Sequence, residues 1–263
     1  RYQGAFWREG GIAPDLELED VLPRFTREAV AVIEDAAQAD RPFFLHLAYT
    51  GPHTPWLPTE AFRGKSEVPL YGDFMEMIDH EVGTVLDALD DSGAAEDTLV
   101  VFCSDNGPVW YPADVERFGH DSAGGLRGMK GDAWEAGHRM PFLVRWPGRV
   151  EPGSVSDQTI GFTDLLATFA DIQGVKLRGD AGPDSFSFLP VLEGRQPEDK
   201  PIRGPLVMRS GSQGHRVIRD GDWKYIAGQG SGGFTKSPKP GPDDPPAQLY
   251  NLREDRAEQR NLH

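Results

Sequence analysis

Cysteine is nearly absent from this chain of 263 residues. Cys103 is the only one, so no disulfide bond can form within the chain. Its neighbours Val101 and Phe102 are apolar, and a free cysteine in such a setting is commonly a small buried hydrophobic residue. We therefore expect Cys103 to be buried and unreactive.

Long apolar runs and an excess of basic residues are also lacking. No stretch approaches the ~20 consecutive apolar residues that a membrane-spanning helix needs. The chain carries 42 acidic residues against 27 basic ones, a formal net charge of −15. Since nucleic-acid binding needs a basic face, we expect no nucleic-acid partner. An anionic substrate would be repelled at long range, so any anion site must be built from a few local positive groups.

The most informative stretch runs from residue 99 to residue 148. Its first part, 99–102, is apolar and largely β-branched, and it is followed by Ser-Asp-Asn-Gly. This pattern predicts a buried parallel strand that ends in a loop, which is where ligands bind in open α/β sheets. Asp105 offers a carboxylate and Asn106 an amide carbonyl, both hard oxygen ligands suited to Ca²⁺ or Mg²⁺. Asp-Asn-Gly also favours a simple turn, and these residues alone leave both interpretations open.

A basic residue framed by glycines follows this loop. Lys130 lies in Gly-Met-Lys-Gly, and glycines let a backbone and a lysine approach an anion closely. A lone lysine is otherwise commonly a solvated surface charge. Earlier in the chain, the apolar run 42–49 ends in a loop that sets His53 between two prolines. The residues alone leave ligand binding and a bystander role equally open for His53.

Periodicity predicts three helices in the first two thirds of the chain. Apolar residues recur at helical spacing over 23–39, 73–92 and 163–173. Because the second of these lies between the apolar runs 42–49 and 99–102, we predict a strand–helix–strand unit. Its two strands would be parallel, joined by a right-handed crossover.

The last part of the chain has the pattern of a small antiparallel sheet. Short strand-like runs at 205–208, 216–219 and 223–226 are separated by turn residues, which predicts a meander. We place a boundary in the Gly- and Asp-rich loop before this part. Residues 1–180 would form an α/β domain, and residues 181–263 a small α+β lobe with antiparallel strands.

Several ordered segments resemble the central signature of the formylglycine-dependent sulfatases, a family of the alkaline-phosphatase-like superfamily. They are FCSDNG, LRGMKG, WEAGHRMPF and RWPG, and Gly-Pro-His-Thr-Pro around His53 is similar to a further family segment. The third has Glu-Ala-Gly where the family usually has Glu-Gly-Gly. The resemblance covers nearly the entire chain. It implies a mixed, mostly parallel sheet flanked by helices, with a small C-terminal lobe built on an antiparallel sheet.

The resemblance also implies the chemistry of sulfate ester hydrolysis. Asp105 and Asn106 would be ligands of Ca²⁺, with Mg²⁺ as an alternative. His53 and Lys130 would bind the sulfate and act in catalysis, one of them helping the leaving group. The substrate would be a sulfated small molecule or a sulfated saccharide, and the location periplasmic or secreted.

The family's nucleophile is missing from these residues. Formylglycine is made from Cys or Ser in a Cys/Ser-x-Pro-x-Arg motif of the N-terminal half, and no such motif occurs here, since Cys103 precedes Ser-Asp-Asn. We therefore expect this chain to be the C-terminal part of a sulfatase, inactive by itself. Its sheet would lack strands and expose apolar surface that a second copy or the N-terminal half would cover.

Two other functions stay open. A phosphoryl or phosphonate ester hydrolase of the same superfamily is one, although those relatives carry His after the metal-binding Asp, where this chain has Asn106. The other is a non-catalytic protein that uses the same groups to bind an anion.

Overall fold

The structure is a computed structural model that describes residues 17–237 and 241–263. Backbone contacts divide the chain into two compact units, Arg1–Thr98 and Leu99–His263. The boundary predicted after residue 180 lies inside the second unit and stays a prediction. No helix of the described ranges is long and apolar enough to cross a membrane.

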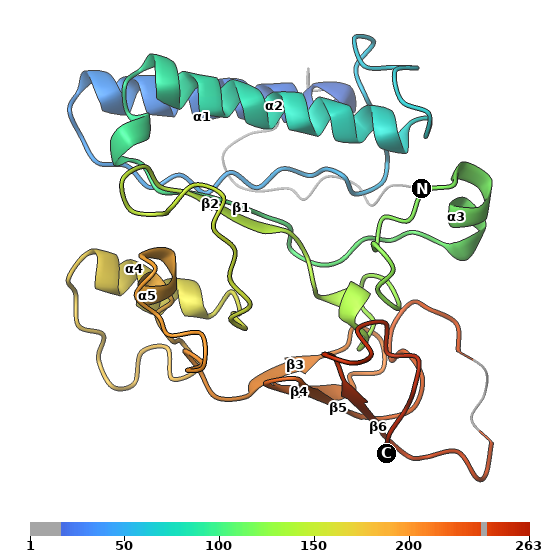
Figure 1. The fold of residues 1–263 in the computed structure, drawn as a ribbon. Helices are drawn as coiled ribbons and strands as arrows, with labels where there is room; N and C mark the ends of the chain where they lie inside the picture. The colour runs from blue at the N-terminus through green and yellow to red at the C-terminus, as the bar shows by residue number, and fades with distance from the viewer. Residues whose placement is uncertain (1–16, 238–240) are drawn as a thin grey trace, which may run out of the picture. The chain divides into compact units, whose positions relative to one another are not determined.

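Two long helices dominate the first unit and lie side by side (Figure 1). They pack through a buried apolar cluster to which Leu22, Phe74, Met77 and Ile78 belong. The helices predicted over 23–39 and 73–92 are confirmed, and their apolar stripes pack against each other. The helical elements of this unit are η1 (Leu18–Asp20), α1 (Val21–Gln38), α2 (Tyr71–Asp91) and η2 (Ala95–Asp97).

Asp73 fixes the start of α2. Its carboxylate accepts hydrogen bonds from the backbone N–H groups of Gly64 (2.8 Å), Ser66 (2.8 Å) and Leu70 (3.4 Å). Burial alone would raise the pKa of Asp73, but these N–H groups outweigh burial and lower the pKa. The carboxylate thus satisfies donors at the helix start and holds the preceding loop against α2.

Residues 41–50 are not a strand, although the sequence predicts one there. Their exposure alternates along the chain, with Phe43 and Leu45 half-buried and Phe44 and His46 exposed, as in a strand. A strand also needs a strand neighbour paired with it in a sheet, and neither sheet of the described residues includes this segment. The predicted strand–helix–strand unit with parallel pairing is therefore wrong for the structure.

The apolar run after residue 99 does form a strand, but its partner is antiparallel. Strand β1 (Val100–Cys103) pairs with β2 (Phe142–Arg145), and Cys103 lies opposite Phe142. The segment between the two strands folds back, so that the first residue of β2 lies opposite the last residue of β1. The side chains of this two-stranded ribbon are partly exposed, so the burial predicted for Cys103 is wrong.

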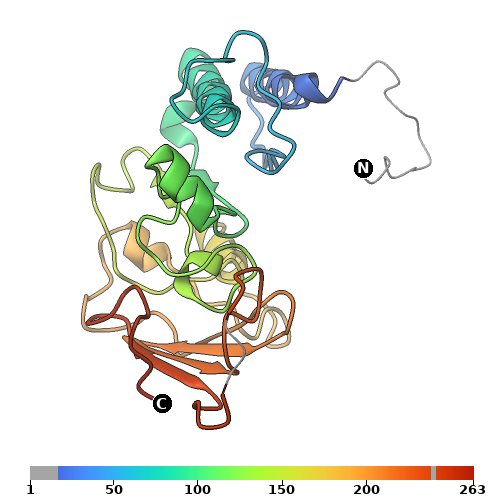
Figure 2. The same ribbon diagram turned by 90° about the vertical axis from the view of Figure 1, so that its right-hand side faces the viewer.

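The other sheet confirms the antiparallel meander that the sequence predicts. Its order is β3-β4-β5-β6, and every neighbouring pair is antiparallel (Figures 1 and 2). The helix predicted from residue 163 is also confirmed. The remaining elements are α3 (Pro112–Phe118), η3 (Glu135–Gly137), α4 (Asp164–Ile172), α5 (Leu189–Leu192), β3 (Leu206–Arg209), β4 (Arg216–Asp220), β5 (Trp223–Ala227) and β6 (Gln248–Asn251).

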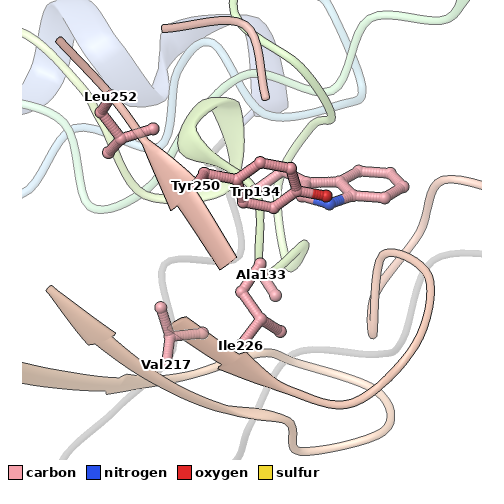
Figure 3. Packing of buried hydrophobic residues seen from close by; sticks show 6 residues of the cluster. All are labelled: Ala133, Trp134, Val217, Ile226, Tyr250 and Leu252. Carbon is pink, nitrogen blue, oxygen red and sulfur yellow. The ribbon is translucent and has the colours of Figure 1, made fainter. Parts of the chain in front are cut away.

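The core of the second unit joins this sheet to the segment around η3. Trp134 lies against Tyr250, and Val217 and Ile226 approach Ala133 from two neighbouring strands (Figure 3). The indole N–H of Trp134 donates to the side-chain oxygen of Gln248 (2.9 Å), which also accepts from the Tyr250 hydroxyl (2.8 Å). The segment that carries Lys130 is therefore built onto the small sheet.

Candidate active site

Asp105 and Asn106 form a turn directly after β1. The Ser104 hydroxyl donates to the backbone carbonyl of Asn106 (3.0 Å), and the Asn106 amide nitrogen donates to the carbonyl of Gly107 (3.1 Å). The side-chain oxygen of Asn106 is thereby left as the acceptor. Asp105 is exposed, and its carboxylate accepts no hydrogen bond from the part of the chain that the structure describes. These two oxygens fit a hard cation such as Ca²⁺.

Two side chains do not complete a cation's shell. Ca²⁺ takes roughly 6–8 oxygen ligands, and this turn offers only the carboxylate of Asp105 and the amide oxygen of Asn106. Within residues 17–237 and 241–263, no group of three or more His, Cys, Asp or Glu side chains could hold a metal ion. Their role as ligands stays a prediction.

Two backbone hydrogen bonds join this turn to the loop that carries Lys130. The N–H of Lys130 donates to the carbonyl of Pro108 (2.7 Å), and the N–H of Gly107 donates to the carbonyl of Gly137 (3.2 Å). A Cβ atom at position 107 would lie 1.6 Å from the carbonyl oxygen of Ala136, so this close approach requires glycine. Asp105, Asn106 and Lys130 are thus brought into one part of the second unit.

Asp132 shapes the loop around Lys130. It is 3% exposed, and its carboxylate accepts from the N–H of Met129 (2.8 Å) and from both the N–H (3.1 Å) and the hydroxyl (2.5 Å) of Thr235. Gly131, the residue after Lys130, has a φ of 80°, a left-handed conformation that favours glycine. The turn after Lys130 therefore favours the glycine that the sequence has there.

His53 lies in the first unit, on an exposed loop. Its Nδ1 donates to the carbonyl of Thr54 (2.7 Å), because a carbonyl can only accept, and this leaves Nε2 to face a ligand. The Trp56 indole N–H donates to the carbonyl of Pro52 (3.0 Å) and closes the loop. His53 and Lys130 belong to different units, and their convergence on one cleft stays a prediction.

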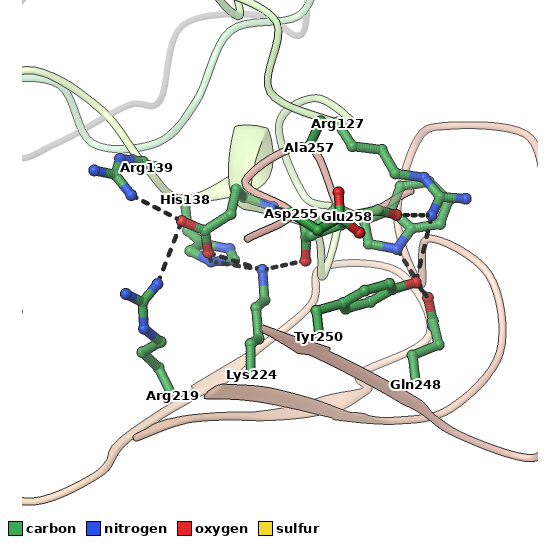
Figure 4. A network of polar contacts seen from close by, with 12 residues as sticks. Arg127, His138, Arg139, Arg219, Lys224, Gln248, Tyr250, Asp255, Ala257 and Glu258 are labelled. Atoms are coloured by element: carbon green, nitrogen blue, oxygen red, sulfur yellow. Dashed lines mark hydrogen bonds and ion pairs between the residues drawn. The ribbon is translucent and has the colours of Figure 1, made fainter. Parts of the chain in front are cut away.

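A buried polar cluster beside this site was missed by sequence reasoning. Lys224 and Glu258 are 0% exposed and Glu135 is 4% exposed. The Lys224 ammonium lies 2.9 Å from Glu258 Oε1 and 3.0 Å from Glu135 Oε1 (Figure 4). His138, Arg139 and Arg219 also surround the Glu135 carboxylate. A signal for Lys224 did exist, since strand alternation puts it on the same face as the apolar Ile226.

The two carboxylates of this cluster differ in their acidity. Burial alone would raise the pKa of Glu135, but the His138 hydrogen bond and the Lys224 charge outweigh burial and lower the pKa far below its usual range. Burial raises the pKa of Glu258, and Lys224 offsets this only in part. A cavity of about 240 Å³ adjoins the cluster and is lined in part by Glu135, Arg139 and Arg219.

Comparisons with known proteins assign this chain to a family. The family model described as Sulfatase matches residues 21–175. The N-acetylgalactosamine-6-O-sulfatase of Bacteroides thetaiotaomicron is 32% identical over 263 residues, covering 97% of this chain and 50% of that protein. Human arylsulfatase A is 32% identical over 251 residues, covering 91% of this chain and 48% of that protein. The chain spans about half the length of these curated relatives.

Solved structures agree in fold. One from work on the metabolism of multiple glycosaminoglycans by Bacteroides thetaiotaomicron has a TM-score of 0.80 and 31% sequence identity, over 94% of this chain and 51% of that one. A complex of Ps i-CgsB with k-i-k-neocarrahexaose has a TM-score of 0.72 and 26% identity, over 92% of this chain and 50% of that one. The fold is thus a sulfatase-like α/β fold. By its family match and its relatives, the chain belongs to the sulfatase family of the alkaline-phosphatase-like superfamily.

Proposed function

We propose that this chain supplies the sulfate-binding and cation-binding residues of a hydrolase that cleaves sulfate esters. The observation that carries the proposal is the pair of backbone hydrogen bonds that holds the Lys130 loop against the Asp105–Asn106 turn. These bonds fix the backbone of Lys130 next to the turn that carries two hard oxygen ligands, and an anionic ester needs a positive charge and a cation close together. Membership of the sulfatase family supports this assignment.

Each residue has a distinct part in the proposed reaction. The Lys130 ammonium stabilises the negative charge of the sulfate oxygens in the transition state. His53, held through Nδ1, uses Nε2 to contact the ester and to hold the proton of the leaving group. Asp105 and Asn106 would hold Ca²⁺, which would supply further charge neutralisation when bound.

No residue of this chain is assigned as the nucleophile. The family's nucleophile is formylglycine, and the chain contains no Cys/Ser-x-Pro-x-Arg motif. We propose that the 263-residue chain alone has no turnover and binds Ca²⁺ weakly. It would need the remaining half of a sulfatase as its partner, and the partly exposed strands β1 and β2 would pair with that half or with a second copy.

The proposed substrate is a sulfated saccharide or a small sulfated molecule. One relative is named as an N-acetylgalactosamine-6-O-sulfatase, and one similar structure holds k-i-k-neocarrahexaose. The overall excess of acidic residues leaves binding of a sulfate ester to the local positive groups, Lys130 above all.

The test is hydrolysis of 4-nitrophenyl sulfate by the protein expressed from its complete reading frame. We expect turnover that falls by about 10²-fold in Lys130→Ala, while the exposed Lys176→Ala control keeps it. Preference for 4-nitrophenyl phosphate would favour the phosphoryl hydrolase instead. Binding of sulfate with no hydrolysis would favour the non-catalytic protein. Multiple turnover by the 263-residue chain alone would overturn the view that its nucleophile lies elsewhere.

A further inference from the structure

Lys224 is an unusual residue for the buried face of a strand. Along β5, Lys224 and Ile226 are buried and their neighbours are exposed, so the ammonium enters the protein interior. Taking this charge out of water offsets much of its attraction to Glu135 and Glu258, and apolar residues often stabilise such a position as well. A contribution to stability is therefore a weak explanation for this ion cluster. The contacts that the cluster makes with the Lys130 loop give a better explanation.

Glu258 makes contacts with two points of the segment before and after Lys130. Its Oε2 accepts from the backbone N–H of Glu135 (2.6 Å), and its backbone carbonyl accepts from the Arg127 guanidinium (2.6 Å). Its φ of 53° turns the backbone so that both contacts form at once. Arg127 also stacks on the ring of Trp134, 3.7 Å from the centroid. Glu258 thus holds the segment near each end.

The segment between these two points is closed on itself and reaches the candidate site. The N–H of Ala136 donates to the carbonyl of Arg127 (3.0 Å), which closes the loop with Lys130 inside it. The loop then contacts the metal-ligand turn through Gly137 and Gly107 (3.2 Å) and through Lys130 itself (2.7 Å to the Pro108 carbonyl). Hydrogen bonds therefore join Glu258 to the loop, and the loop to the Asp105–Asn106 turn.

We propose that Glu258 is a positioning residue, which with Lys224 and Arg127 fixes the loop that carries Lys130 and the Asp105–Asn106 turn. The functional part of this inference rests on the proposed roles of these residues. Glu258 itself is 0% exposed, so its proposed action is through the loop and not on a ligand. Loss of its carboxylate would leave Glu135 as the one carboxylate beside Lys224 and free the N–H of Glu135, so the loop would open more often than the sheet beneath it.

The first test measures amide hydrogen exchange in the 263-residue chain itself. We expect Glu258→Gln to speed exchange at the amides of Gly107 and Lys130 by about tenfold, the size of losing one charge-assisted hydrogen bond, and Glu258→Ala by more. The amides of β4 would keep their rates. Glu254→Gln is the matched control, because Glu254 is an exposed residue of the same segment after β6. Unchanged rates at both amides, or an equal change in β4, would overturn the proposal.

The second test uses the protein expressed from its complete reading frame. We expect Glu258→Gln to lower kcat for 4-nitrophenyl sulfate by about 10- to 100-fold, as when catalytic groups move by about 1 Å. Met77→Ala, a core change in the first unit, serves as a variant of lowered stability without the positioning defect. Equal losses of kcat in the two variants would mean that Glu258 acts only through stability. An inactive wild type would refute the proposed function and leave the exchange result standing.

Discussion

In the first unit two helices meet through Leu22, Phe74, Met77 and Ile78, whereas in the second unit a lysine and two glutamates lie at the seam between loop and sheet. Apolar contacts have no direction, so helices can adjust around a swapped side chain of similar size. A buried ion pair holds its partners at one distance and fails when one of them is removed. The contact between the two helices thus depends on apolar volume, whereas the loop and sheet of the second unit add to their apolar cluster a few specific polar contacts that also shape the candidate site.

The sharpest way to break this comparison is to remove the buried charge without changing its volume much. We expect Lys224→Met to lower the free energy of unfolding by about 3–5 kcal/mol, because it leaves the buried Glu258 carboxylate without its cation and removes one of the positive groups around Glu135. Met77→Leu in the first unit should cost less than about 1.5 kcal/mol. Urea denaturation at pH 7 measures both. A cost below that of Met77→Leu would show that the second unit is also held mainly by apolar contact.

Each unit contributes one predicted sulfate contact, and turnover tests whether both are needed. In the complete enzyme, His53→Ala and Lys130→Ala should each cut kcat/KM by about 10²-fold or more, as for loss of a transition-state charge stabiliser. His80→Ala, an exposed histidine on α2, is the control for the first unit. Near-normal turnover in both variants would remove the assigned roles.

The pH dependence of Asp73 sharpens the account of the first unit. Its folded-state pKa is lowered, so its contribution is present above the unfolded pKa of about 3.9 and is lost as pH falls through the lower folded value. We expect Asp73→Asn to lower the free energy of unfolding by about 1–3 kcal/mol at pH 7. This difference should shrink below about pH 4 in urea titrations. Asp79→Asn, exposed on the same helix, should change stability by less than about 0.5 kcal/mol at either pH.

The smallest expected effect is a gain. Gly83 lies inside α2, and a Cβ atom there would meet no atom within 4 Å. Gly83→Ala should therefore stabilise the chain by about 0.5–1 kcal/mol, measured as a rise in the midpoint of thermal unfolding. Gly93→Ala is the control, since Gly93 has equal space but a φ of 74° and should lose stability. A loss in Gly83→Ala would mean that α2 is under a constraint beyond its own geometry.

The helices were predictable because their signal is local. The apolar stripe over 73–92 gave α2 within two residues at its start and one at its end. The sheets needed information that periodicity does not carry. The apolar run 42–49 alternates in exposure like a strand, but its sequence does not indicate which strand would pair with it. The run at 99–102 does not indicate whether its neighbour is parallel or antiparallel.

The candidate site divides in the same way. Lys130 and the Asp105–Asn106 turn were predicted because side-chain chemistry and ordered motifs are visible in a sequence. The contacts that join them are backbone hydrogen bonds, such as Gly107 to Gly137, which side-chain identity does not encode. Glu258 was missed because its role needs Lys224, Arg127 and Glu135 in three dimensions. Only strand alternation, which puts a lysine on a buried face, pointed toward this cluster.

The contact between Glu135 and Glu258 spans 123 positions of the chain. During synthesis the helix pair can form early, because its partners are close in sequence, and such local contacts form fast. The Lys130 loop can form its hydrogen bonds to the Asp105–Asn106 turn early as well, but the chain must reach position 258 before Glu258 can hold the loop against the sheet. Until then the backbone N–H of Glu135 and the Arg127 guanidinium lack their Glu258 partner, so in the ribosome-bound chain the loop would lack its attachment to the sheet.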